Sequence, residues 1–476
     1  MSRINTNVPS LVAARVLGQQ GDSLQTSLER LSTGLRINSG KDDPAGLIAS
    51  ESLRAEGRAI QSAIENSNRA SAVVSTAEGA LGEVNSLLLE LENLVDSAAN
   101  EAGLSDDEVK ANQLQIDSIL DTINRISNTT QFNGRKLLDG SLAYSTSGVT
   151  SSELASVRIG TAKLPDGGSK SVVVQVTNSA ETGTLIFSAA GLAATNAVTL
   201  QVAGQYGSDL FSFAGSTSIA SIATAINQSK GVTGVSAIAS SNNRLYLNST
   251  DFGADAFVSV QVNAGTFATK DTGGNVATQD YGLNPSVTIN GTAAETNGLR
   301  ASVRTSNLSA ELILSQTFAT QTASTSTFTV TGGGANFAIS QTLSLGGRES
   351  IGFDSVAASS LGDAVNGYLS SLGSGQANAL DSANFAAAQR IVGNAVDQVS
   401  SLRGRIGAFQ KNTLESTVNS LQVAYENIQA ADSAIRDTDF ALETSRLTRA
   451  QILVQAATQT LGVANQAPSA ALSLLR

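Results

Sequence analysis

The chain has 476 residues, and its 29 Lys and Arg against 40 Asp and Glu leave a formal net charge of −11. The length predicts about two to four domains, and the acidic balance argues against nucleic acid as a partner, because phosphate binding needs a basic surface. The absence of His and Cys excludes the Ser-His-Asp triad, Cys-His pairs, zinc sites built from these residues, and disulfides. We therefore expect a protein that is not an enzyme and holds no cofactor or metal, with only a glycosidase-like pair of carboxylates left formally open.

The sequence predicts neither a membrane span nor a secretory signal. No stretch is apolar for long enough to cross a bilayer. Residues 1–10 lack the basic region, apolar core and small-residue cleavage site of a signal peptide. We therefore expect no membrane insertion, and we expect that a protein working outside the cell would leave by a route without a cleaved signal.

The first 40 residues predict an amphipathic helix. Pro9 follows an extended stretch and suits the first turn of a helix. The apolar stripe after it advances in steps of seven, four, three and four residues, which is the seam of a helix that packs on a partner helix. This stripe consists of Leu17, Leu24, Leu28, Leu31 and Leu35.

A second, much longer helix is predicted from Pro44 to about Asn100. The segment before it breaks the helical pattern, and Asp43 is the predicted N-cap with Pro44 at the first helical position. At 1.5 Å per residue the helix would reach roughly 80 Å, which suits a rod. Its apolar stripe is Ala77, Leu81, Val84, Leu88, Leu91 and Val95.

A third helix is predicted from about Ser105. The acidic residues that follow Ser105 favour the positive end of the helix dipole. Isoleucines such as Ile116, Ile119 and Ile123 supply an apolar face. Residues 132–138 then indicate a turn that leads into a strand or hairpin.

The composition changes between residues 141 and 375. Only about one residue in eleven is charged there, and Ser, Thr, Gly, Ala and Val dominate. Short β-prone runs, such as 171–176 and 327–331, are separated by turn residues. The pattern predicts one or two β-rich domains, with a boundary near 280–290, and low-complexity disorder is the competing interpretation.

Helical patterning resumes near Ser382. The stripe Val392, Val399, Leu402, Ile406 and Phe409 is followed by a strict seven-residue repeat of Leu414, Leu421, Ile428 and Ile435. A break at 437–439 precedes a terminal helix. Its seam comprises Leu447, Ala450, Val454, Ala457, Leu461 and Ala464.

This order of segments predicts an α+β fold: a long helical coiled-coil and rod formed by the N- and C-terminal segments, with a β-rich outer domain inserted between them. Both ends carry apolar stripes, so each can be the partner of the other. A lone helix with a narrow apolar stripe is marginal in water. We therefore expect both ends to be disordered in the monomer and to fold on assembly.

Several motifs, in order, resemble those of bacterial flagellins. SLERLSTGLRIN at 27–38 is similar to the family's first helix and its exit, and KDDPAGL at 41–47 is similar to its spoke-region signature. TQFNG at 130–134 matches the turn after the third helix. The C-terminal resemblance lies in KNTL at 411–414, RAQIL at 449–453, NQAP at 465–468 and LLR at 474–476.

The resemblance covers about 140 residues at the start and 100 at the end, and it implies a layout. The chain would have an inner terminal coiled-coil core, a helical rod with a hairpin, and a surface-exposed variable insert that contains a small repeat-like module. The inner core would comprise residues 1–42 plus 437–476, and the rod would comprise residues 43–140 plus 376–436. The insert would comprise residues 141–375, and the small module within it residues about 209–262.

The resemblance also implies function and partners. The chain would be the subunit of the extracellular flagellar filament used for motility, a helical homopolymer of itself. It would also meet an export chaperone, a type III-like export apparatus, and hook-associated and cap proteins.

Two sets of assembly residues follow from the stripes and this layout. The filament core would be assembled by Leu24, Leu28, Leu31, Leu35, Leu447, Val454 and Leu461. The rod would be packed by Leu81, Val84, Leu88, Leu91, Val399, Leu402, Ile406 and Phe409. Charged residues of the long helix, such as Arg54 and Arg58, either contact neighbouring subunits or belong to solvated faces.

One departure from the family concerns an animal toll-like receptor, which recognises a Leu-Gln-Arg-x-Arg-Glu-Leu run in many flagellins. The matching run here is LLELENL at 88–94, in which Glu90 and Glu92 replace basic residues between Leu89 and Leu94. A reversed charge at an interface costs binding energy. We expect weak or absent receptor activation.

Two alternatives to the filament subunit remain open from the sequence. The first is the related hook–filament junction protein, which shares the helical ends but is present in few copies. The second is an enzyme or adhesin carried by the insert, although the absence of His excludes a HExxH zinc motif.

Overall fold

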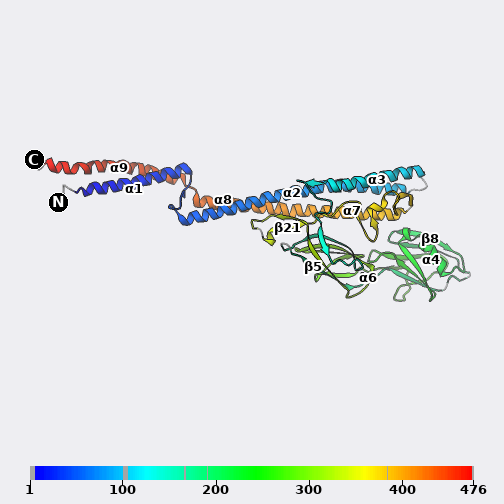
Figure 1. Ribbon diagram of the computed structural model, residues 1–476. Helices are drawn as coiled ribbons and strands as arrows, with labels where there is room; N and C mark the ends of the chain where they lie inside the picture. The colour runs from blue at the N-terminus through cyan, green and yellow to red at the C-terminus, as the bar shows by residue number, and fades with distance from the viewer. Residues whose placement is uncertain are drawn as a thin grey trace. The chain divides into compact units, whose positions relative to one another are not determined.

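The computed structural model describes residues 6–99, 105–165, 168–189, 191–193, 195–342, 344–382 and 384–473 (Figure 1). The LLR ending that contributes to the family resemblance lies outside these residues. The chain divides into two compact units, each assembled from separate stretches of sequence. The terminal unit comprises residues 1–66, 340–342 and 416–476, and the central unit comprises residues 67–339 and 343–415.

The terminal unit consists of long helices. Helices α1 and α9 lie side by side and run antiparallel (Figure 1), because the start of α1 contacts the far part of α9 and its end contacts the start of α9. The beginning of α2 packs against α8 through Ile60, Ala63 and Leu421. The helices are α1 (Val8–Thr33), α2 (Pro44–Ala98), α8 (Ser416–Arg436) and α9 (Phe440–Ser473).

Short polar signals set the helix ends of the terminal unit. Asn7 caps α1 by accepting a hydrogen bond from the Ser10 amide at 3.2 Å, and Gly34, at φ 75°, ends this helix in the left-handed conformation. Asp43 accepts from the Gly46 amide at 2.9 Å, so the predicted cap before Pro44 is confirmed. The break at 437–439 is also present, and Asp439 caps α9 by accepting from the Leu442 amide at 3.0 Å.

The helical part of the central unit contains the rest of α2 together with α3 (Asp106–Thr129) and α7 (Phe385–Ala408), which continues as a π-helical segment (Phe409–Glu415). Helix α3 begins with a capping box between Ser105 and Glu108. Helix α2 ends at Ala98, two residues earlier than we expected. Helix α7 begins three residues after the predicted start, because Leu380–Ser382 forms a separate 3₁₀ turn.

The hairpin predicted after the third helix is confirmed. Strands β1 (Gln131–Phe132) and β2 (Arg135–Lys136) pair antiparallel. The two residues between them, Asn133 and Gly134, have φ of 49° and 78°. Positive φ at both central positions is what a tight type I′ hairpin turn requires.

The first β-rich core consists of two antiparallel sheets that face each other. One has the order β15-β14-β5-β19-β3 and the other the order β16-β17-β18-β4. In β5, Val172, Val174 and Val176 alternate inward. The strands are β3 (Tyr144–Ser147), β4 (Leu154–Ala162), β5 (Lys170–Asn178), β14 (Ser286–Ile289), β15 (Thr292–Ala293), β16 (Glu295–Asn297), β17 (Arg300–Arg304), β18 (Leu308–Leu314) and β19 (Thr325–Gly333).

A second β-rich core is inserted into the first, between β5 and β14. Its sheets have the orders β12-β6-β10-β9 and β13-β11-β7-β8, and α4 packs against β9. An isolated bridge between Glu181 and Leu283 closes the neck of the insertion. Its elements are β6 (Thr184–Ser188), β7 (Val198–Gly204), β8 (Gly207–Phe213), α4 (Ile219–Gln228), α5 (Lys230–Thr233), β9 (Val235–Ser240), β10 (Arg244–Ser249), β11 (Phe257–Ala264), β12 (Thr269–Lys270) and β13 (Gln279–Tyr281).

The middle of the chain therefore holds two β-rich cores in the described residues, and the disorder interpretation is wrong for them. The chain passes between the two cores twice. It enters the inserted core near Glu181 and returns to the first core near Leu283, within the predicted boundary at 280–290. Helix α6 (Gln316–Ala319) lies between β18 and β19 and belongs to the first core, in which Phe318 and Ala319 are buried. The connection back to the helices is made by the hairpin strands β20 (Ala335–Ala338) and β21 (Arg348–Ile351), by β22 (Gly362–Asp363) and β23 (Gly367–Tyr368), and by two 3₁₀ turns (Leu345–Gly347 and Leu369–Leu372).

Candidate assembly interface

The described residues direct attention to helix surfaces rather than to a reaction centre. Within them, no group of three or more acidic, His or Cys side chains is placed to hold a metal ion. Nor does any helix in the described part of the chain have the length and apolarity to cross a membrane. The features that need an explanation are the seams and the exposed apolar faces of the long helices.

The seam between α1 and α9 is built mainly from small and polar residues. Ala13 and Ser27 are the buried residues of α1, and they meet the column of α9 that contains Glu443, Ala450 and Ala457. Small side chains let the two helices approach closely, but they remove little apolar surface from water. The pair is therefore held by a thin apolar contact.

The residues predicted to assemble the filament core flank the most buried column of this seam, and none of them is fully buried in the single chain. Leu28 is 49% exposed. The other six are only partly buried in the single chain: Leu24, Leu31, Leu35, Leu447, Val454 and Leu461.

Large apolar side chains also cover the outer faces of both helices. They include Leu11 at 64% exposed and Val463 at 70%. A groove of about 600 Å³ runs between the helices and is lined by Val12, Val16 and Leu453 among other residues. Contiguous exposed apolar surface of this kind marks an interaction site in a soluble protein. The remaining large exposed residues of this pair are Val8, Val12, Val16, Phe440, Leu442, Ile452 and Leu453.

The residues predicted to pack the rod are placed differently. All eight are buried in one apolar cluster of the central unit, with exposures from 0% to 8%. They come from the part of α2 after residue 66, from α7 and from the π-helical segment, and they are Leu81, Val84, Leu88, Leu91, Val399, Leu402, Ile406 and Phe409.

The positions that correspond to the receptor-recognition run lie on α2. Leu89 is 45% exposed, and Glu90 is exposed and accepts a hydrogen bond from the Gln115 side chain at 3.0 Å. Glu92 and Leu94 are partly buried. A negative charge therefore stands at the surface at position 90.

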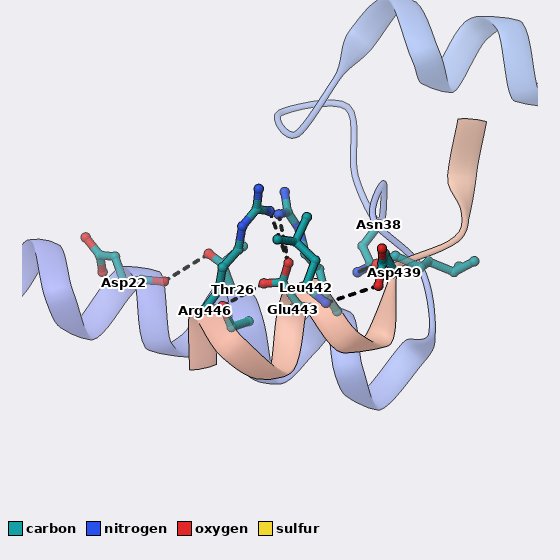
Figure 2. Close-up of polar contacts among 10 residues, drawn as sticks. Asp22, Thr26, Asn38, Asp439, Leu442, Glu443 and Arg446 are labelled. Carbon is teal, nitrogen blue, oxygen red and sulfur yellow. Dashed lines mark hydrogen bonds and ion pairs between the residues drawn. The ribbon is translucent and has the colours of Figure 1, made fainter. Parts of the chain in front are cut away.

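Sequence reasoning missed a buried polar cluster at the base of the α1–α9 pair (Figure 2). Glu443 is 4% exposed and accepts a hydrogen bond from the Ser27 hydroxyl at 2.7 Å. Arg446 lies 3.2 Å from its other oxygen, and Arg30 lies 3.8 Å from that same oxygen. The signal was present in the sequence, because Glu443 stands seven residues before Ala450 and so interrupts a small-residue column.

Comparisons with known proteins find matches to both helical ends of the chain and to a segment of its middle. The chain matches the bacterial flagellin N-terminal helical region over residues 4–143, the C-terminal helical region over 389–475, and the flagellin hook IN motif over 199–251. Flagellin B of Vibrio cholerae is 30% identical over 472 residues, and the match covers 99% of both chains. The B-type flagellin of Pseudomonas aeruginosa is 31% identical over 531 residues, again with 99% of both chains covered.

Solved structures of flagellar proteins are also similar to parts of the chain. FlgL of Xanthomonas campestris matches with a TM-score of 0.28 and 12% identity, over 79% of this chain and 98% of that one. The D1-D2-D3 domains of the flagellar cap protein FliD from Escherichia coli match with a TM-score of 0.28 and 19% identity, over 56% of this chain and 64% of that one.

Long helices at both ends and β-rich cores between them make the fold α+β, and the matched helical regions are those of a structural protein. The full-length relatives name the class more narrowly: the chain belongs to the bacterial flagellins. It is a structural subunit of the flagellar filament, lies outside the cell, and is not an enzyme. These relatives do not support the hook–filament junction alternative better than the filament subunit.

Proposed function

We propose that this flagellin polymerises by ordering α1 and α9 against the same helices of neighbouring subunits. The observation that carries the proposal is the exposure of large apolar side chains on a helix pair with a thin seam. A free pair would leave these side chains in water, and a crowded array of pairs buries them at about 25 cal/mol per Å². Ordering the ends has an entropic cost, which this burial offsets.

The proposed layout assigns residues 1–42 and 437–476 to the inner core of the filament and residues 43–140 and 376–436 to the outer rod. The breaks after α1 and before α9 support the first division. The insert, residues 141–375, would lie on the filament surface. Its two self-contained apolar cores support this, because they need no neighbouring subunit for their burial.

The array would grow as an open helix. The exposed apolar faces of α1 and α9 carry different residues, so one face of a subunit meets a different face of the next. Such heterologous contacts generate open filaments when the rotation does not close a ring.

Export in an unfolded state is part of the same proposal. Marginal terminal helices would remain accessible to an export chaperone and would pass a narrow type III-like apparatus. Hook-associated and cap proteins would bind the ends of the growing polymer. The exposed apolar faces of α1 and α9 are the surfaces available for these partners.

We further infer weak activation of the animal toll-like receptor. The support is the carboxylate of Glu90 at the α2 surface beside exposed Leu89, with Glu92 two residues further along the helix. A basic-to-acidic change costs affinity at a charge-complementary interface. A reporter-cell assay should show little response to purified monomer, and full activation at sub-nanomolar monomer would contradict this inference.

Electron microscopy of the purified full-length chain and of a variant lacking residues 1–40 and 440–476 tests the assembly proposal. We expect the full-length chain to form long filaments and the truncated variant to form none. Hydrogen exchange on the central unit of both proteins is the control, and it should show the same protection. Filaments from the truncated variant would overturn the proposal, and so would joining of the full-length chain to pre-formed hooks in only a few copies.

A further inference from the structure

We propose that Glu443 sets the register between α1 and α9. This inference rests on the proposed assembly through these helices and goes beyond it by assigning the register to one side chain. The apolar seam by itself does little to distinguish one register from the next.

The apolar seam of α9 repeats almost perfectly every seven residues. One column of the seam contains Ala450, Ala457 and Ala464, and the adjacent column contains Leu447, Val454 and Leu461. Sliding α9 by seven residues along α1 replaces Ala450 and Ala457 by alanines, Leu447 by Val454, and Val454 by Leu461; the exception is Leu461, which is replaced by Pro468. The apolar contact area therefore changes little, and it provides little energy to resist a slip.

Glu443 is the exception in the alanine column. It lies seven residues before Ala450, and its carboxylate is buried against Ser27, with Arg30 and Arg446 on its other oxygen. Figure 2 shows Arg446 beside Glu443. A slip of seven residues would place Ala450 opposite Ser27. The Ser27 hydroxyl and the Arg30 guanidinium would then lose their buried acceptor, and removing one partner from a buried polar contact is costly.

The chain connections alone do not prevent this slip. The segment between α1 and α2 is joined to the segment between α8 and α9 by two hydrogen bonds. The Arg36 amide donates to the Arg436 carbonyl at 2.7 Å, and the Thr438 amide donates to the Gly34 carbonyl at 2.9 Å. Both bonds precede the first turn of α9. Unwinding residues 440–446 would supply seven residues of slack without breaking either bond, so the register has to be held inside the helix pair.

A single polar residue in an apolar seam is a known way to specify register, at some cost in stability. Ser27 is 5% exposed and lies in the α1 column that also contains Ala13 and Gln20. Each helix thus has one buried polar residue in its column, Ser27 on α1 and Glu443 on α9, and the two are joined by a hydrogen bond. Only the observed register brings these two residues together.

Pairs of introduced cysteines measure the register directly, because the natural chain has no Cys. Ser10 and Asn465 are in contact across the pair, with their side-chain oxygens 2.6 Å apart. In the full-length chain, S10C with N465C reports the observed register, and S10C with L472C, seven residues further along α9, reports the slipped register. Each cysteine pair is combined with Glu443→Ala, with Glu443→Gln, and with a control, Glu426→Ala, which removes an exposed carboxylate of α8.

Filaments are assembled, treated with a short bismaleimide, and the intramolecular products of the two cysteine pairs are compared. With Glu443 present, and in the Glu426→Ala control, we expect the S10C–N465C product to exceed the S10C–L472C product by at least about tenfold. Glu443→Ala should bring the two yields within about threefold of each other. Glu443→Gln, which keeps an acceptor for Ser27 but loses the charge, should fall between these values.

An unchanged product ratio in Glu443→Ala filaments would overturn the inference while leaving the proposed function intact. Should Glu443→Ala form no filaments, Glu443→Gln decides: an intermediate ratio supports the inference and the parent's ratio overturns it. Absence of filaments from the parent chain with Glu443 would instead overturn the proposed function, and the register inference with it.

Discussion

The two helical seams of this flagellin share their residue spacing but not their burial. In the central unit, Leu81, Leu88 and Leu91 of α2 are completely buried. In the terminal unit, Leu28 of α1 follows the same kind of stripe and is 49% exposed. The difference arises because the central seam has several covering elements, α3, α7 and the connecting segments, whereas among the described residues the helix packed along α1 is α9. A stripe therefore predicts that a partner exists, and the number of partners decides whether one subunit is enough to cover the stripe.

The largest expected effect separates the two seams in the monomer. Leu88→Ala should destabilise the central unit by about 2–5 kcal/mol, because it leaves a cavity in a closed core. Leu28→Ala should change the monomer by less than about 0.5 kcal/mol, because the side chain is already half in water. Denaturant unfolding of both monomers measures the difference, and equal losses would contradict the comparison.

The second effect appears only on assembly. Leu28→Ala and Ile452→Ala remove exposed apolar side chains from α1 and α9. Each should raise the critical concentration for polymerisation about tenfold, which is about 1.4 kcal/mol per subunit. Sedimentation of filaments against total protein gives this quantity. Val423→Ala on α8, also an exposed aliphatic residue, is the matched control, and a shift as large as that of Leu28→Ala would argue against a special role of the terminal pair.

A smaller effect concerns the acid stability of the central unit. Burial raises the pKa of Asp117, but hydrogen bonds from Ser374 and Gln113 outweigh it and hold the pKa below its usual value. A lowered folded-state pKa stabilises the fold above the unfolded pKa of about 3.9, and this contribution is lost as the pH falls through the folded value. Asp117→Asn should therefore cost up to about 1 kcal/mol at pH 7 and much less at pH 2–3. A loss that stays constant over this pH range would contradict the assignment.

Local signals accounted for much of the fold. Asp43 and Pro44 predicted the start of α2, Asn-Gly at 133–134 predicted a hairpin, and the stripe through Leu81 and Leu88 predicted the buried face of the rod helix. Each of these depends on neighbours within a few residues or on a regular period.

Long-range pairing was beyond such reasoning. Val174 of β5 pairs with Ile289 of β14, although the entire inserted core lies between them in sequence. The sequence therefore indicated a boundary near 280–290 without showing that one core is nested in the other. In the same way, the stripe of α9 did not reveal that Glu443 would be buried, because its acceptor role depends on Ser27, more than 400 residues away.

Hydrogen exchange of the monomer and of the filament, compared segment by segment, tests the central claim most directly. We expect residues 8–33 and 440–473 to exchange rapidly in the monomer and to become protected in the filament, whereas residues 81–95 are protected in both. Equal, strong protection of the terminal segments in the free monomer would show that α1 and α9 are stable without neighbours, and would contradict the account.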